Sequence, residues 1–581
     1  MNEIKLPEEE AEKSADASRE QEQIEAAAPE KPRSIARSAG IVSIAVMFSR
    51  VLGLAREMVF AKYFGAGFLY DAFLVGFRIP NILRDLFAEG ALSAAFVKVF
   101  TDYQLKKSEA EAWQLASLIF NALAIVLSVI TIVGILVAPY LVPLLARGFS
   151  PEKAALAVTL TQIMFPFILL VALAAVAMGV LNTRGRFGVP ASASTAFNIA
   201  AIIFGLGFAF YLSGGVWETS SDKDLVPSAA AQWAIIGMAI GTLIGGAFQL
   251  FIQVPSLLRV GFRFSPVVSF TDEGVRRVMR LMGPAIIGTS AVQVKVLVDT
   301  FIVSEIDGGQ SWLSYAFRLM QFPIGLFGVA IGTAAIPTLS RLASENNFTK
   351  FRSTLSDALK LVFLLTIPAA CGLVVLGEPI IRLLYERGEF NQIDTNMTAW
   401  ALAAYSIGLS GYAAIKIVSP SFYALNDAKT PMYVSVASIL VHIVVSYSML
   451  KLLSTVGVTS ERTSGFGHVG VALATSTVAL VNFFALTLLM RRRISGLNGR
   501  EIFTAFIKIV IASAAMSAVC YASYYFLTNS LGAKTLVVKL VEVFVPIALG
   551  GIAFVAMAKI LRVGEIDKLF DVLKRKLGRG K

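Results

Sequence analysis

Apolar residues run in long, nearly unbroken stretches from about residue 37 to about residue 562, and short polar turns separate them. An α-helix needs roughly 20 apolar residues to cross a bilayer. The pattern therefore predicts fourteen transmembrane helices, of which the longest are expected to tilt or kink. The predicted spans are 37–63, 68–104, 111–145, 152–182, 187–213, 230–258, 273–305, 312–341, 350–384, 393–424, 428–453, 466–491, 502–529 and 534–562.

The composition agrees with this pattern. Hydrophobic residues make up 56% of the 581 residues and charged residues only 15%, whereas a soluble domain carries about 25% charged residues. The apolar runs are continuous rather than alternating, which argues against a β-barrel. We therefore expect an all-α polytopic membrane protein.

The net charge of +12 is explained more simply by membrane topology than by nucleic-acid binding. Loops on one side of the predicted spans carry eighteen lysines and arginines, and loops on the other side carry nine. The richer side is expected to be cytoplasmic, and an even number of spans puts both termini there. Residues 1–36 are expected to form a disordered tail without a signal peptide, and residues 563–581 a basic tail.

A weak internal repeat divides the spans. At a constant offset of 243 residues, Gly65 aligns with Gly308 and Pro80 aligns with Pro323. The two prolines are expected to kink their helices. Transporters are often built from such repeats, with the substrate site between the halves. The predicted domains are an N-terminal lobe (37–258), a C-terminal lobe (259–491) and two extra helices (492–562).

Three arginines, Arg50, Arg56 and Arg84, lie inside the first two predicted spans. An arginine at the centre of a membrane helix costs roughly 2.5–3.5 kcal/mol on insertion scales, so it normally faces water or a partner. The same spans also contain acidic residues, among them Asp71 and Glu89, but basic residues outnumber them and the region is net cationic. This predicts a polar chamber for an anionic passenger, because the arginine fork suits pyrophosphate.

Helical spacing extends this candidate set. Arg50 and Glu57 lie seven residues apart and share one stripe of the first span, while Ser49 and Arg56 share the neighbouring stripe. Arg318 in the eighth span would supply a cation from the other lobe. An ion-pair seam between the first two spans, and interfacial snorkelling of Arg318, are the structural alternatives.

Other polar residues offer less. Asp299 in the seventh span follows Lys295 by four residues, so an ion pair within the helix and a cation site are both compatible with the spacing. The chain has only two cysteines and two histidines. Neither a disulfide framework nor a zinc site or Ser-His-Asp triad is expected from so few.

A series of ordered motifs runs along the predicted spans. The segments are Phe48–Glu57, Phe64–Gly67, Asp71–Phe73, Pro80–Arg84, Phe87–Phe96, Gly283–Ala285, Arg318–Pro323, Gly328–Ala330, Phe422–Leu425 and Lys429–Pro431. Together they resemble the MurJ/MviN family, the flippases of the lipid-linked peptidoglycan precursor lipid II. The resemblance covers nearly all of residues 37–562.

The resemblance implies the fold of the multidrug/oligosaccharidyl-lipid/polysaccharide exporter superfamily, with two lobes in a V around a central cavity and residues 492–562 forming a lipid groove. It also implies that arginines of the cavity engage the pyrophosphate and that two acids assist. By position these residues are Arg50, Arg56, Arg84, Arg318, Asp71 and Glu89, to which helical spacing adds Ser49 and Glu57.

Two departures from the family pattern bear on function. Phe317 stands where relatives often have aspartate before the arginine of the eighth span. In the eleventh span, His442 and Ser446 approximately match positions where relatives commonly have Asn or Asp, linked in some to sodium binding. Asp299 remains a candidate sodium ligand, but the set around it is incomplete.

The expected function is a lipid II flippase of the bacterial inner membrane that works by alternating access, a transporter and not an enzyme. Its expected partners are lipid II, membrane lipids and cell-wall synthesis proteins, with no nucleic acid and no cofactor beyond a sodium ion. A flippase for another undecaprenyl-pyrophosphate glycan stays open. A cation-coupled multidrug exporter fits an arginine-rich chamber less well. Membrane potential and a sodium gradient both remain as energy sources.

Overall fold

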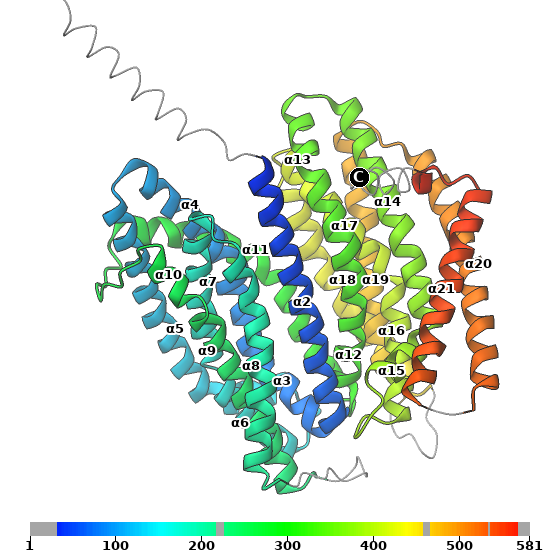
Figure 1. The fold of residues 1–581 in the computed structure, drawn as a ribbon, viewed down its shortest axis with the longest axis horizontal. Coiled ribbons are helices and arrows are strands. Elements are labelled where there is room, and N and C mark those ends of the chain that lie inside the picture. The colour runs from blue at the N-terminus through cyan, green and yellow to red at the C-terminus, as the bar shows by residue number, and fades with distance from the viewer. Residues whose placement is uncertain (1–31, 216–225, 457–464, 533–534, 568–581) are drawn as a thin grey trace, which may run out of the picture.

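The computed structural model describes residues 32–215, 226–456, 465–532 and 535–567 (Figure 1). Within these ranges the side chains at 32–41, 43, 88–91, 93–94, 285, 287–289 and 291 are outside the description. Most of the two predicted tails, 1–36 and 563–581, therefore lies outside the described residues. All regular structure among the described residues is helical.

The helices form fourteen consecutive segments in the described chain, and each overlaps one predicted span. The helices are α2 (Pro32–Phe64), α3 (Phe68–Arg84), η1 (Asp85–Gly90), α4 (Ala91–Lys106), α5 (Glu109–Leu145), α6 (Pro151–Met164), α7 (Phe167–Thr183), α8 (Gly188–Leu212), α9 (Ala229–Phe251), α10 (Val254–Arg259), α11 (Glu273–Val303), α12 (Gly309–Pro323), η2 (Ile324–Val329), α13 (Ala330–Ser344), α14 (Phe348–Val375), α15 (Gly377–Leu384), α16 (Gln392–Ile407), α17 (Leu409–Ala424), α18 (Lys429–Ser454), α19 (Gly467–Arg493), α20 (Gly499–Ser530) and α21 (Leu536–Ile560).

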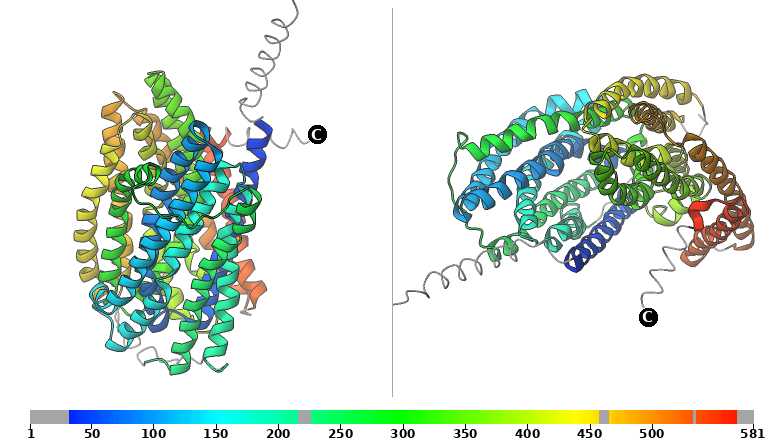
Figure 2. Two further views of the ribbon diagram at one scale, coloured as in Figure 1. Left: turned by 90° about the vertical axis from the view of Figure 1, so that its left-hand side faces the viewer. Right: turned by 90° about the horizontal axis from the view of Figure 1, so that it is seen from above.

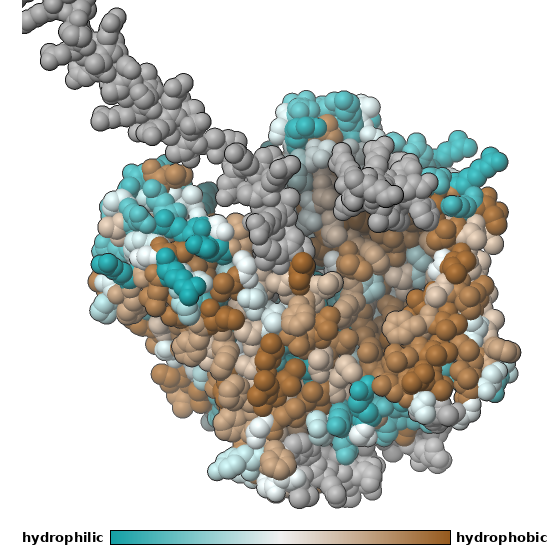
Figure 3. Space-filling model, in the orientation of Figure 1, coloured by the Kyte–Doolittle hydropathy of each residue, from teal (hydrophilic) through white to brown (hydrophobic). Residues whose placement is uncertain are grey.

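Hydropathy separates these segments into two groups. Among the described residues, ten helices are long and apolar enough to cross a membrane, or eleven if α16 and α17, which bend by 41° at Gly408, form one span. The segments outside that group are α2, α3–η1–α4 and α11, and these carry the predicted site residues except Arg318, which lies on α12. Figure 3 shows a broad hydrophobic band across the visible face with polar residues above and below it, as a bilayer requires.

The two halves of the chain share irregularities as well as order. The second segment has a π-helical stretch, η1, soon after Pro80, and the eighth has another, η2, directly after Pro323. The fourth segment breaks between α6 and α7, and the tenth breaks between α16 and α17. These matched breaks in spans two and eight and in spans four and ten agree with the predicted repeat.

The buried cores show how the two lobes meet. We call the end of the bundle where α2 begins the predicted cytoplasmic end, at the top of Figure 1, and the opposite end the outer end. The largest apolar core lies toward the outer end and joins both lobes, since α2, α3 and α6 contribute to it together with α12, α15 and α16. Toward the predicted cytoplasmic end one core lies within the second lobe and the last two helices, and another packs α11 against α4 and α5 of the first lobe. The lobes are therefore closed together at the outer end.

Three helices depart from a simple two-lobe arrangement. The seventh span, α11, packs on α4 and α5 of the first lobe as well as on α18 and α19 of the second. The last two helices, α20 and α21, pack on one another and against α14 and α15 at the edge of the second lobe (Figures 1 and 2). α11 thus contacts both lobes.

Candidate functional site

The carboxylate of Glu57 is the meeting point of three helices. It accepts a hydrogen bond of 2.5 Å from the hydroxyl of Tyr70 on α3 and one of 2.9 Å from Nη2 of Arg318 on α12. Its own neighbour Arg56 on α2 lies 3.4 Å away. Only 4% of the Glu57 side chain is exposed. We call these four residues the Glu57 cluster, and it links the first lobe to the second.

The Glu57 cluster carries more positive than negative charge, because two guanidinium groups share one carboxylate. The Arg318 side chain is 40% exposed and that of Arg56 is 16% exposed. The guanidinium of Arg56 also lies over the ring of Phe197 on α8, 5.2 Å from its centroid. Its Nε has no hydrogen-bond partner among the described residues. The exposed part of Arg318 can therefore donate to an anion, whereas the unpaired Nε of Arg56 is buried in this state.

Arg50 lies two turns before the cluster on α2, toward the predicted cytoplasmic end, and is exposed. Its guanidinium packs against η2 so closely that a Cβ built on Gly325 would fall 1.9 Å from Nη1. A side chain at position 325 would therefore displace the guanidinium of Arg50 from this position. Ser49 contributes its backbone carbonyl, which accepts a hydrogen bond of 3.3 Å from Nδ2 of Asn198 on α8.

Arg84 has a counter-ion beside it in the sequence. Its Nη2 lies 2.7 Å from Oδ1 of Asp85, and a quarter of its side chain is exposed. The other oxygen of Asp85 accepts a hydrogen bond of 3.3 Å from Nε2 of Gln293 on α11. The site thus extends from α3 to α11. The side chain of Glu89 lies outside the described residues.

The structure gives Asp71 protein partners instead of an exposed position. Its carboxylate is fully buried and lies 2.9 Å from Nζ of Lys153 on α6, while Ser311 on α12 donates both its backbone N–H and its hydroxyl, at 2.9 and 2.6 Å. The backbone N–H of Gly308 donates a further bond of 2.9 Å, and Lys153 also reaches Asp307 at 2.5 Å. We call this set the outer clasp.

The alternative reading, a seam of ion pairs between the first two spans, is not what the described residues show. The charged pairs Arg56–Glu57 and Arg84–Asp85 join neighbours on one segment. What connects the first span to the second at the Glu57 cluster is the hydroxyl of Tyr70. Ion pairing instead connects the lobes.

Asp299 lies on α11 beside α18. Its Oδ1 is 2.5 Å from Nε2 of His442, and the hydroxyl of Ser446 lies 3.2 Å from the same nitrogen. The alternative of an ion pair with Lys295 is not what the geometry shows, since Nζ of Lys295 donates to the hydroxyl of Tyr412 at 3.2 Å. The described residues contain no group of three or more His, Cys, Asp or Glu side chains arranged to hold a metal ion.

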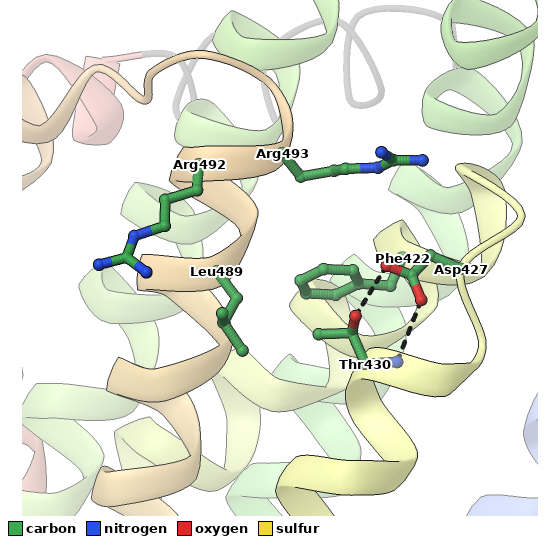
Figure 4. Close-up of a pocket in the computed structure, with 6 residues that line it drawn as sticks. All are labelled: Phe422, Asp427, Thr430, Leu489, Arg492 and Arg493. Carbon is green, nitrogen blue, oxygen red and sulfur yellow. Dashed lines mark hydrogen bonds between the residues drawn. The ribbon is translucent and has the colours of Figure 1, made fainter.

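A separate cavity of about 310 Å³ lies at the predicted cytoplasmic ends of α17, α18 and α19 (Figure 4). Arg493 extends over Asp427 there, while Arg492 points away. Hydrogen bonds from the backbone N–H and the hydroxyl of Thr430 lower the pKa of Asp427. Because its acid is already satisfied locally and none of the membrane arginines reaches it, this cavity is not part of the candidate site.

Sequence reasoning missed several partners. Nothing in the sequence spacing distinguishes Tyr70, Phe197 or Lys153. Each can be recognised as a partner of the site only from its contact with a residue on another helix. A tyrosine directly before Asp71 and a lysine in the first turn of an apolar span were weak signals that a buried carboxylate needs donors.

Comparison with known proteins points in one direction. The family model described as lipid II flippase MurJ matches residues 60–542. A probable lipid II flippase MurJ from Vibrio cholerae is 33% identical over 464 residues, which is 78% of this chain and 82% of that protein. The lipid II flippase MurJ of Burkholderia cenocepacia is 36% identical over 459 residues, covering 78% of this chain and 83% of that protein.

Solved structures agree on the fold. A lipid II flippase MurJ in an inward closed conformation matches with a TM-score of 0.69 and 28% identity, covering 90% of this chain and 99% of that one. An inward-facing multidrug transporter of the MATE family matches with a TM-score of 0.60, over 79% of this chain and 98% of that one. At 14% identity the second match speaks for the fold alone.

Proposed function

We propose that this chain, which belongs to the lipid II flippase MurJ family, moves lipid II from the inner to the outer leaflet of the bacterial cytoplasmic membrane. It is a multi-pass helical membrane protein with the fold of the solved MurJ structure. Both termini are assigned to the cytoplasm from the distribution of lysine and arginine in its loops. No covalent step is needed for such a reaction.

The Glu57 cluster is the observation that carries this proposal. Two arginines from opposite lobes converge on one carboxylate and leave donors over. A pyrophosphate offers two negative groups with the spacing that planar guanidinium forks bind well. Arg50 and Arg84 continue the line of positive charge toward the predicted cytoplasmic end. The site therefore keeps a net positive charge that can bind the headgroup of a pyrophosphate-linked lipid.

Alternating access follows from competition at Glu57. In the state described here the lobes share a core at the outer end, so the headgroup enters from the cytoplasmic side. Pyrophosphate then competes with Glu57 for Arg318 and Arg56, which loosens the Arg318–Glu57 link between the lobes. The outer clasp around Asp71 must also open, so we assign Asp71 to this latch rather than to direct contact with lipid II in this state. The lipid tail stays in the bilayer beside α20 and α21.

The test is flipping in cells depleted of their own flippase, with a periplasmic enzyme that cleaves externalised lipid II as the reporter. Cleavage is expected with the wild type and not with alanine variants of Arg50, Arg56, Arg84 or Arg318. Arg341→Ala is the matched control, since its side chain is 71% exposed outside the site. If a well-expressed wild type gives no cleavage, the substrate is another undecaprenyl-linked glycan or a drug, and the proposal fails.

A further inference from the structure

The polar residues of α11 divide between the two lobes. Gln293 contacts Asp85 of the first lobe, and two turns further along Asp299 contacts His442 on α18 of the second lobe. α11 therefore connects α18 to the segment that carries Arg84. A ligand at Asp299 would have direct influence over transport, and this is where the family resemblance leads us to look for a sodium ion.

The donor set at Asp299 does not fit sodium. Hard cations take several oxygen ligands in a flexible shell, whereas the oxygen Oδ1 of Asp299 is held 2.5 Å from an imidazole nitrogen. The hydroxyl of Ser446 on α18 lies 3.2 Å from that same nitrogen. The imidazole thus lies between the two oxygens that a cation would have to bridge. His442 is fully buried, so it cannot swing into water to make room.

The local charges oppose sodium as well. Arg78 on α3 and Lys295 on α11 both interact electrostatically with Asp299, and Lys295 is held in place by Tyr412. Two permanent cations already offset the single carboxylate. A third positive charge would be repelled by these two, and solvent screens that repulsion only in part, because the Asp299 side chain is 26% exposed.

We infer that His442 occupies the place of a coupling cation in this protein, tying α11 to α18 through Asp299, so that transport does not depend on sodium. The statement about transport rests on the proposed function, whereas the statement about sodium binding does not. Nε2 of His442 faces Asp299, and its Nδ1, which has no partner among the described residues, is a nitrogen rather than an oxygen ligand. An Asn or Asp side chain at this position would instead present an oxygen to the same space.

Purified protein tests the inference through its thermal-unfolding midpoint, measured in NaCl, KCl and choline chloride at equal ionic strength. A ligand that binds only the native state raises that midpoint further as its concentration increases relative to its Kd. The wild type is expected to give the same midpoint in all three salts. A concentration-dependent rise in NaCl that KCl does not reproduce would overturn the inference.

A double variant supplies the positive control. The change of His442→Asn together with Ser446→Asp removes the imidazole. It also puts two side chains with cation-ligating oxygens on one face of α18, four residues apart and opposite Asp299. A sodium-specific rise of about 1–3 °C is expected for this variant. A folded double variant without that rise would overturn the role given to His442, as would sodium-dependent stabilisation of the wild type. If the double variant does not fold, the wild type alone decides.

The unfolding measurement needs no substrate, so it is independent of whether the chain flips lipid II. A wild type that is insensitive to sodium and also fails to flip lipid II would overturn the proposed function and leave this inference standing. A wild type that flips lipid II and is stabilised by sodium alone would do the reverse.

Discussion

The Glu57 cluster and the outer clasp are built from similar residues but satisfied to different degrees. Both bring charged side chains from the two lobes together in the interior. In the clasp, the Asp71 carboxylate has a lysine and three hydrogen-bond donors, and Lys153 is only 5% exposed. In the cluster, two arginines share Glu57, and Arg318 is 40% exposed. One site is saturated by protein, whereas the other is not.

This difference separates a latch from a binding site. A buried ion pair stabilises a structure only when further hydrogen bonds offset its desolvation, and removing one partner is then expensive. A site with surplus donors gains those hydrogen bonds from a ligand instead. We therefore expect substitutions of the two arginines in the Glu57 cluster to change transport more than stability, and substitutions in the outer clasp to do the opposite.

The largest effect is expected for Arg56→Ala. Removing one partner of a hydrogen-bonded charge pair at a binding site costs about 2–5 kcal/mol, on the order of 30-fold to several thousand-fold in affinity. Complementation of a flippase-depleted strain should be abolished at normal protein level. Its stability should hardly change, because Arg56 makes one long ion pair and one contact with Phe197.

Arg56→Lys sharpens the same test, because lysine keeps the charge but lacks the planar fork. Weak residual transport is expected from this variant. Normal growth with Arg56→Ala at normal expression would show that Arg56 is not an essential contact. If Arg56→Ala lost stability as well as transport, the Glu57 cluster would not differ from the outer clasp in this respect.

The second effect concerns the clasp. Lys153→Met leaves Asp71 buried with its charge uncompensated, which should lower the free energy of unfolding by about 3–5 kcal/mol. Thermal unfolding of purified protein measures this, with exposed Arg147→Met at the same end as the control. Adding Asp71→Asn should recover part of the loss, since the two residues interact directly. No recovery would mean that Lys153 stabilises the fold by another route.

The sequence predicts the helices well because membrane spans are specified locally. Each predicted span overlaps a helix, and the second span, predicted from 68 to 104, is a segment from Phe68 to Lys106. The packing of α11 against the first lobe is not readable in this way, because it depends on which faces meet across the molecule. The π-helical stretches near Pro80 and Pro323 likewise depend on tertiary packing.

The candidate site divides along the same line. Intramembrane arginines such as Arg56 and Arg318 are conspicuous in an apolar stretch, and the structure brings these two together at Glu57. Asp71 is equally conspicuous, yet its partners Lys153 and Ser311 come from distant segments. Helical projection tells which residues share a face of their own helix, but not what lies opposite that face.

A third, smaller effect is expected for Tyr70→Phe. The change removes the 2.5 Å hydrogen bond to Glu57 while keeping the ring, which packs on Tyr315. Hydrogen bonds to charged groups contribute about 1.5–3 kcal/mol, so the unfolding midpoint should fall accordingly. Transport should persist because both arginines remain. Abolished transport with an unchanged midpoint would instead place the Tyr70 hydroxyl on the substrate.

The smallest effect tests why the two ends of the bundle differ. At the predicted cytoplasmic end, Arg277 of α11 pairs with Asp102 of α4 at 2.6 Å, but the two side chains are 44% and 26% exposed. Exposed pairs contribute about 0.2–1 kcal/mol and are screened by salt. Arg277→Ala should therefore lower stability by no more than about 1 kcal/mol, and 1 M KCl should remove the difference from the wild type. The Lys153→Met difference should survive the same salt, because its ion pair is buried. If both differences vanish in salt, the two ends are held equally weakly and burial does not set which end stays closed.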